Sequence, residues 1–172
     1  MELSKYIACI CEGTAEQVII DLLLDNNLLI FSRESLIEHE VIRCRSGRKF
    51  EEQYLRKGFT EQITVFRILD SRRENFRLSK AYINKVKVIN VITAPEIEML
   101  VIFNENKYSH YKKSGIKPSE YCTSILKYHD VKSEAFVKRY FSNIESLVNA
   151  IREYKRVSDV KQNEITLADI LK

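Results

Sequence analysis

The stretch that decides the fold runs from Tyr6 to Gln17 and reads YIACICEGTAEQ. Its first part, up to Ile10, is an apolar run of the length typical of a buried strand, and the part from Thr14 onward is typical of a first helical turn. Glu12 is therefore expected at the carboxyl end of a strand, against the positive end of the next helix. Open α/β sheets bind ligands at that edge. The alternative interpretation is that Glu12 only caps or solvates a turn.

A second apolar run ends in the same way. It extends from Ile63 to Leu69, and Asp70 follows it directly. Two carboxylates at the ends of two core strands can meet in space and hold a divalent cation. This second carboxylate favours a ligand site over the simple turn.

The composition is that of an ordinary globular domain. The chain has 172 residues, of which 45% are hydrophobic and 30% charged, enough for one domain with a real core. Lysine and arginine number 28 against 24 acidic residues, a net charge of +4. This modest excess permits a nucleic-acid partner without requiring one.

The cysteines and the hydropathy limit the class of protein further. Four cysteines show no CxxC pair and no metal-ligand spacing with the three histidines, so a zinc site is not expected. The first residues lack the apolar region of a signal peptide, and no apolar run is long enough to span a bilayer. We expect a cytoplasmic protein with free thiols and no membrane partner.

The remaining pattern alternates between strands and helices up to about residue 106. Strands are expected within residues 36–44 and over 86–92, and helices over 14–27, 50–58, 76–85 and 95–103. From 107 onward a polar connection leads to helices starting near 117, 136 and 144. We expect one domain over residues 1–156, helical from about 107, and an amphipathic tail over 157–172. The alternation predicts parallel strands covered by helices on both faces.

Three acidic positions in this order carry a resemblance to a known family. They are Glu12 after the first strand, Asp70 after the third, and Glu98 after the fourth, where the sequence reads Pro95-Glu96-Ile97-Glu98-Met99-Leu100. Together with Ile10-Cys11-Glu12-Gly13, this order resembles the Toprim fold, and within it the RloB-like proteins associated with phage defence. The resemblance covers roughly residues 5–155.

The resemblance implies a Toprim-like open sheet of about four mainly parallel strands with a helical C-terminal third. It also implies a nuclease that hydrolyses phosphodiesters of DNA or RNA with Mg²⁺ or Mn²⁺, in defence against phage. Asp70 would then be the principal metal ligand, and Glu12 a second ligand or the general acid/base. Glu98 would support the site.

One position departs from the family pattern. The family has Asp-x-Asp after the third strand, whereas this chain has Asp70-Ser71-Arg72. Arginine removes a carboxylate ligand and adds a positive charge, although Glu74 follows nearby. The alternative is that Arg72 and Arg73 bind phosphate directly. The chain would then be a degenerate Toprim protein that binds nucleic acid or regulates a partner.

Basic residues gather at the same edge in the sequence. Arg67, Arg72, Arg73 and Arg77 flank Asp70, and a second group follows the second strand, namely Arg43, Arg45, Arg48 and Lys49. They form either a track for a phosphate backbone or a solvated surface. DNA, RNA and transfer RNA stay open as substrates, as do a homo-oligomer and a partner such as an ATPase or another defence-system subunit. No glycine-rich phosphate loop supports a generic nucleotide-binding protein.

Overall fold

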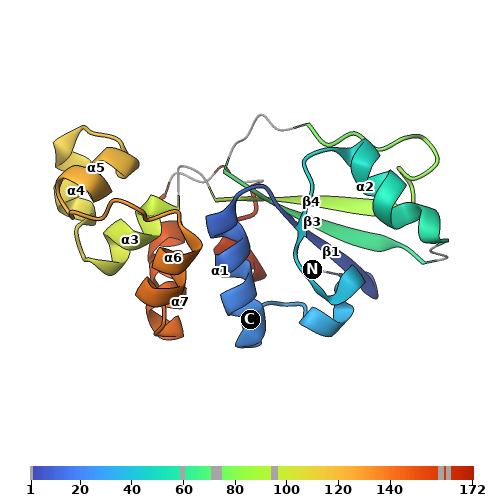
Figure 1. Cartoon of the computed structure of the whole chain (residues 1–172), viewed down its shortest axis with the longest axis horizontal. Helices are drawn as coiled ribbons and strands as arrows, with labels where there is room; N and C mark the ends of the chain where they lie inside the picture. Colours follow the sequence, from blue (N-terminus) through green and yellow to red (C-terminus); the bar gives the residue numbers. More distant parts are fainter. Residues whose placement is uncertain (1, 59–60, 71–74, 94–96, 159–160, 162–163) are drawn as a thin grey trace.

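The computed structural model describes residues 2–58, 61–70, 75–93, 97–158, 161 and 164–172. Its centre is a four-stranded sheet in the order β2-β1-β3-β4, and every neighbouring pair is parallel (Figure 1). The strands are β1 (Tyr6–Cys11), β2 (Ile42–Arg43), β3 (Ile63–Leu69) and β4 (Val86–Ile92). The predicted α/β fold with four parallel strands is confirmed.

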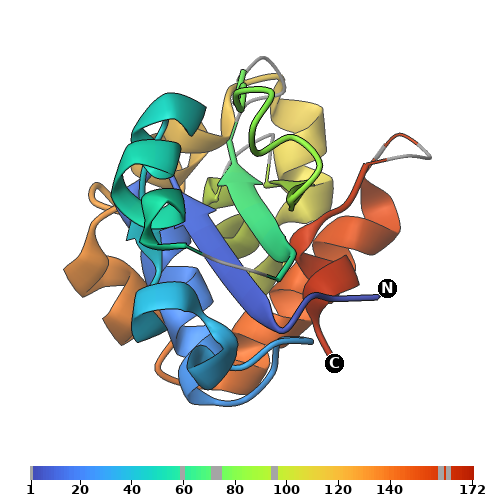
Figure 2. The ribbon, with the colours of Figure 1, turned by 90° about the vertical axis from the view of Figure 1, so that its right-hand side faces the viewer.

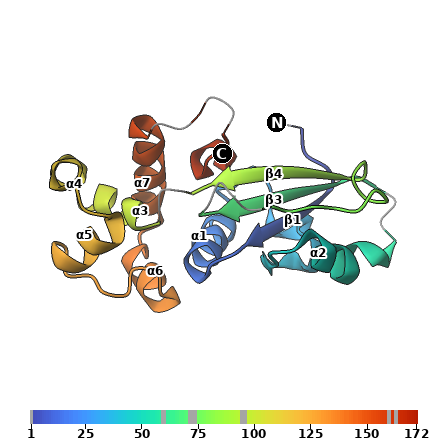
Figure 3. The same ribbon diagram turned by 90° about the horizontal axis from the view of Figure 1, so that it is seen from above.

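Helices follow β1, β2 and β4. They are α1 (Thr14–Asp25), α2 (Gly47–Tyr54), α3 (Glu98–Asn104), α4 (Tyr108–Ser114), α5 (Pro118–Ser124), α6 (Glu134–Tyr140) and α7 (Ile144–Val157). The described residues also form the 3₁₀ turns η1 (Arg33–Ser35), η2 (Ile37–His39), η3 (Leu55–Lys57) and η4 (Leu167–Ile170). Helices α3 to α7 gather beyond the ends toward which the strands point (Figure 3). Among the described residues, no helix has the length and apolar character needed to cross a membrane.

The central strands β1 and β3 are buried on both faces, which explains their nearly continuous apolar runs. One face carries Cys9, Phe66 and Val91 and packs against α1 and η4, with Phe31 stacked on Phe66 at 4.8 Å between ring centroids. The other face carries Ala8 and Val65 and packs against α2 and the segment 76–82. Alternate residues of each strand therefore belong to two separate apolar clusters.

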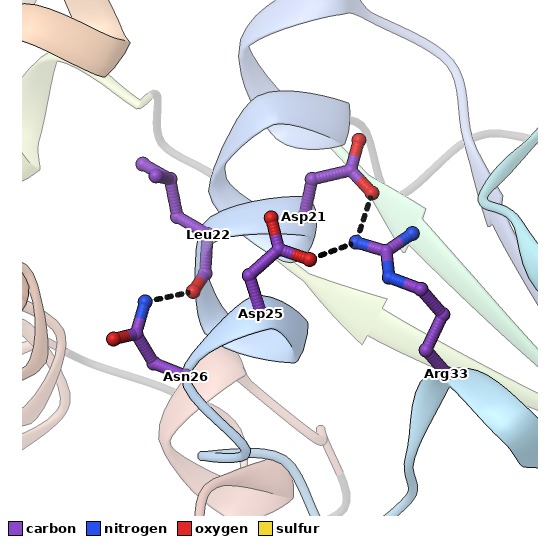
Figure 4. Close-up of polar contacts among 5 residues, drawn as sticks. All are labelled: Asp21, Leu22, Asp25, Asn26 and Arg33. Atoms are coloured by element: carbon purple, nitrogen blue, oxygen red, sulfur yellow. Dashed lines mark hydrogen bonds and ion pairs between the residues drawn. The ribbon is translucent and has the colours of Figure 1, made fainter.

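Helix α1 ends where the asparagine pair predicts. Asn27 takes the left-handed conformation with φ of 55°, and the Asn26 side chain donates a hydrogen bond to the Leu22 carbonyl at 2.8 Å. Arg33 reaches back to this end of the helix and pairs with Asp21 at 3.0 Å and Asp25 at 2.6 Å (Figure 4). This fork ties the chain after α1 to the helix that precedes it.

The last residues belong to the core, unlike the tail expected over 157–172. Ile165 bridges to Val91 beside β4, and its carbonyl accepts a hydrogen bond from the Ile92 N–H at 2.7 Å. Leu171 bridges to Leu29, and Ile170 is fully buried. The two ends of the chain consequently lie near each other on one side of the molecule (Figure 2).

Three further local predictions differ from the structure. The segment 76–85 is not a helix but an irregular stretch followed by turns. Its apolar residues Phe76, Leu78 and Tyr82 do not share one helical face, and all three pack on the sheet cluster instead. The polar connection expected after 107 contains α4. The second strand has only two paired residues, so Arg43 lies within it and not after it. Pro95, the expected helix start, lies outside the described residues.

Gly47 generates a prediction about how α2 is seated. A side chain at this position would collide with the backbone carbonyl oxygen of Arg77, because α2 and the segment 76–82 approach closely there. Alanine normally favours a helix over glycine by about 1 kcal/mol. We nevertheless expect Gly47→Ala to lower the free energy of unfolding by about 1–3 kcal/mol, measured by urea denaturation. The exposed Gln53→Ala in the same helix is the control and should change it by less than about 0.5 kcal/mol. A Gly47→Ala variant as stable as the wild type would mean that the backbone of Arg77 moves away from the new side chain at no cost in stability.

Candidate active site at the carboxyl edge of the sheet

The strand register brings Glu12 and Asp70 to one edge. Cys11, the last residue of β1, pairs with Ile68 of β3 on one side and with Arg43 of β2 on the other. Glu12 and Asp70 directly follow β1 and β3, so they emerge from adjacent parallel strands at the same carboxyl edge. Asp70 is exposed, whereas the Glu12 side chain is only 8% exposed. The predicted placement of these two carboxylates at one edge is confirmed.

Glu12 is held by an arginine from the middle of the sheet. Arg67 of β3 is 1% exposed, and its Nη2 donates to Glu12 Oε1 at 3.1 Å. Its Nη1 lies 3.5 Å from Asn90 Oδ1 on β4, and its guanidinium sits over the Phe76 ring at 4.7 Å from the centroid. The sequence shows only a single arginine inside an apolar strand, which suggests a phosphate-binding residue beside Asp70. In the structure Arg67 compensates the charge of Glu12.

Glu16 is a site residue that the sequence analysis missed. It lies in the first turn of α1, is 5% exposed, and its carboxylate occupies the space that a side chain on Gly13 would need. Burial raises the pKa of Glu16, and the charges of Asp70 and Glu98 raise it further against the opposing effects of its own backbone N–H and of Lys132. Glu16 therefore shares one electrostatic neighbourhood with Asp70, Glu98 and Lys132.

Glu98 links this edge to the helical third of the chain. It begins α3, is 2% exposed, and its Oε1 pairs with Lys132 Nζ at 3.2 Å. Its other oxygen, Oε2, is buried and has no hydrogen-bond partner among the described residues. Lys132 precedes α6 and its side chain is half exposed. Glu98 is thus paired with a lysine from a distant part of the chain, and its supporting role at the site stays a prediction.

The predicted basic track is divided in the structure. Arg43, Arg45, Arg48 and Lys49 are all exposed. Arg43 lines a hollow beside α1 with Asp21 and Asp25, whereas Arg48 lines a different hollow beside α2. Arg72 and Arg73 lie outside the described residues, so their orientation relative to Asp70 stays a prediction.

The donors at this edge suit a hard cation. Mg²⁺ and Mn²⁺ prefer carboxylate oxygens, and Mg²⁺ takes only one or two from protein, with water and phosphate as its other ligands. Within the part of the chain that the structure describes, no three acidic, histidine or cysteine side chains lie close enough together to hold an ion. Among the described residues, the carboxylates of the predicted metal site are therefore those of Glu12 and Asp70.

The four cysteines take no part in this edge. Cys9, Cys11, Cys44 and Cys122 are all buried free thiols. Burial, with a smaller contribution from Cys9, raises the pKa of Cys11 well above its ordinary value, so this thiol stays protonated. These residues act as small core side chains.

Comparison of the chain with protein-family models, with curated proteins and with solved structures found no match. The Toprim and RloB-like resemblance therefore remains a prediction based on the sequence motifs. The fold and the carboxyl edge described above are what the structure adds to it.

The Glu12–Arg67 ion pair can be tested by a double-mutant cycle. Arg67→Met leaves a buried carboxylate without its arginine, so we expect the free energy of unfolding to fall by about 3–5 kcal/mol. Glu12→Gln in the same chain should recover much of this loss, because the remaining charge is removed. Urea denaturation of the two single variants and the double variant gives the coupling energy. The exposed pair Arg156 and Glu153, changed to Met and Gln, is the control and should show little coupling. Additive losses at Glu12 and Arg67 would contradict a coupled buried pair.

Glu16 predicts a dependence of stability on pH. Its folded-state pKa is raised, so the unfolded chain releases this proton at a lower pH than the folded chain does. The contribution of Glu16 to stability is therefore lost as the pH rises from the ordinary carboxyl pKa through the raised one. Glu16→Gln should be more stable than the wild type at neutral pH, and this gain should vanish below about pH 4.

Urea denaturation across a pH series measures this effect. Glu145→Gln, an exposed glutamate in the first turn of α7, is the control. It should be slightly less stable at neutral pH because it loses a favourable helix-dipole interaction. A Glu16→Gln variant that is destabilised at neutral pH would show that the ionised carboxylate is stabilised at this edge.

Proposed function

We propose that the protein is a divalent-metal-dependent phosphodiester hydrolase of Toprim type that acts on nucleic acid. The observation that carries this proposal is the convergence of carboxylates at one edge. Glu12 and Asp70 end two adjacent parallel strands, and Asp70 and Glu98 both act on the pKa of Glu16. Negative charges that act on one another at a sheet edge are unfavourable for stability, and a bound cation would offset them, which supports this proposal.

The residues divide the proposed chemistry between them. Asp70, exposed at the edge, would bind Mg²⁺ or Mn²⁺, with Glu12 as the second ligand in the ionised form that Arg67 favours. When bound, such an ion polarises a phosphate and stabilises the charge that develops on it. Glu16 is suited to giving and taking a proton because its pKa is raised. Glu98 would hold Lys132 beside the substrate phosphate.

A role in phage defence, with an ATPase or another defence-system subunit as partner, belongs to this proposal only through the resemblance of the sequence motifs. The same holds for the RloB-like affiliation. The proposal includes both DNA and RNA as alternative substrates.

The Glu12–Arg67 ion pair favours a second candidate function. Arg67 supplies a positive charge to Glu12 from inside the sheet, as a metal ion would. A chain that needs no metal at this edge could bind nucleic acid through its arginines and regulate a partner without cutting. The two candidates differ in whether the protein cleaves bound nucleic acid when a divalent ion is present.

Asp70→Asn tests the enzyme. The change keeps the shape of the side chain and removes its charge, so Mg²⁺- or Mn²⁺-dependent cleavage of single-stranded and duplex DNA and RNA should fall at least about 100-fold. Binding of the same nucleic acids in EDTA should persist. Asp25→Asn, at the opposite end of α1 and paired with Arg33, is the control and should cut like the wild type. Arg72→Asp restores the Asp-x-Asp pattern and should raise the affinity for Mn²⁺.

The outcome also separates the two candidates. Wild-type protein that binds nucleic acid but cuts none of these substrates with either ion, in the presence of its natural partners, would end the hydrolase proposal. The non-catalytic binder would then remain.

A further inference from the structure

A groove with three arginines runs beside α2, on the face of the sheet that carries Arg67. One wall is formed by α2 and η3, and the other by the segment 77–82. Arg48 and Arg56 line the first wall, and Arg77 and Tyr82 line the second. The hollow has a volume of about 570 Å³, within the range of sites that take small ligands or single units of a polymer.

Three contacts fix the two walls relative to each other. Gly47 touches the backbone of Arg77 so closely that no side chain fits between them. The Phe50 and Phe76 rings pack at 5.8 Å between centroids, and the Ser79 N–H donates a hydrogen bond to the carboxylate of Glu51 in α2. The groove is therefore preformed, and a ligand would bind without first ordering its walls.

The arginines present their charges along the groove. Arg48 and Arg56 are eight residues apart on the same wall, which corresponds to roughly 12 Å along a helix. Arg48 is 87% exposed, and its ion pair with Glu52 is a surface contact that a stronger ligand can displace. Arg56 and Arg77 are also exposed. Guanidinium groups distributed along a groove in this way suit phosphates of an extended backbone.

We infer that this groove binds a single nucleic-acid strand, with Arg48, Arg56 and Arg77 on its phosphates and Tyr82 against a base. The inference rests on the proposed function, for which it supplies the path of the substrate. A single strand fits better than a duplex, because an aromatic ring can stack only on a base that is not enclosed in a double helix. The small volume of the hollow favours the same choice.

The groove is joined to the candidate active site by one segment of chain. Phe76, which packs on α2 at the groove, also covers the Arg67 guanidinium that holds Glu12. Helix α2 begins shortly after Ile42, which pairs with Ile10 at the end of β1, so Arg48 in its first turn lies toward the carboxyl edge. A strand in the groove would consequently lead to that edge.

Charge reversal at the groove tests the inference. The probes are fluorescein-labelled oligo(dT) and oligo(U), and their binding is measured by fluorescence anisotropy in EDTA over a range of salt. Arg56→Glu/Arg77→Glu should weaken binding at least about tenfold, and the alanine versions should lower the slope of log K against log salt by about 0.7 for each arginine withdrawn from a phosphate. Tyr82→Ala should weaken binding more than Tyr82→Phe, which keeps the stacking ring.

Lys112→Glu/Lys113→Glu in α4 makes the same change of charge on an exposed helix far from the groove, and should retain most of the binding. Equal weakening in both double variants, or none in Arg56→Glu/Arg77→Glu, would overturn the inference. It would also be overturned if polyglutamate displaced the probe as well as an unlabelled strand does, because the arginines would then serve acidic polymers in general. A duplex bound more tightly than either single strand would have the same effect.

The failure of this inference differs from the failure of the proposed function. If Arg56→Glu/Arg77→Glu still shows full Asp70-dependent cleavage, the proposed role of the groove is wrong and the hydrolase proposal stands. If the wild type does not cleave but binds a strand through Arg56 and Arg77, the hydrolase proposal is wrong and the proposed role of the groove stands.

Discussion

The in-register parallel pairing of β1, β3 and β4 is the constraint on which the rest of the structure depends. β1 and β3 pair from Tyr6–Ile63 to Cys11–Ile68, and β3 and β4 pair from Ile63–Val86 to Leu69–Ile92. Strands that run in the same direction and end together deliver their following residues to one edge. Glu12 and Asp70, far apart in the sequence, lie at the same edge because of this register and not because of any local motif.

The buried ion pair of Arg67 and Glu12 is the costly feature in this arrangement. Both charges are removed from water. Apolar side chains of similar size in their place would cost little free energy of unfolding. The structure nevertheless surrounds Arg67 with Glu12, Asn90 and Phe76 from three different elements. Such a pair fixes the orientation of Glu12 and leaves Asp70 as the exposed carboxylate beside it. The edge thus contains one fixed acid and one accessible acid.

Much of the fold could be predicted from the sequence because β1 and β3 are largely apolar runs and helices follow β1, β2 and β4. The same argument placed Glu12 and Asp70, since both follow such runs directly. It could not show that Glu16 is buried, because a glutamate in a first helical turn is normally solvated. Nor could it show that Arg67 pairs with Glu12, or that the segment 76–82 covers the sheet without forming a helix. These features depend on contacts between distant residues, which periodicity does not report.

The path of the last residues has a consequence for how the chain folds. The segment 165–172 lies along β4 at Val91 and closes against residues 28–30 near the end of α1. Until it has been synthesised, the outer edge of β4 presents unpaired backbone groups to other chains. During translation, the chain that precedes this segment therefore leaves the edge of β4 uncovered at Val91 and Ile92, where it can pair with a neighbouring copy. Once residues 165–172 have docked, Ile165 covers the edge of β4 at Val91 and Ile92, so this part of the edge is protected from aggregation only after that segment has folded back onto the sheet.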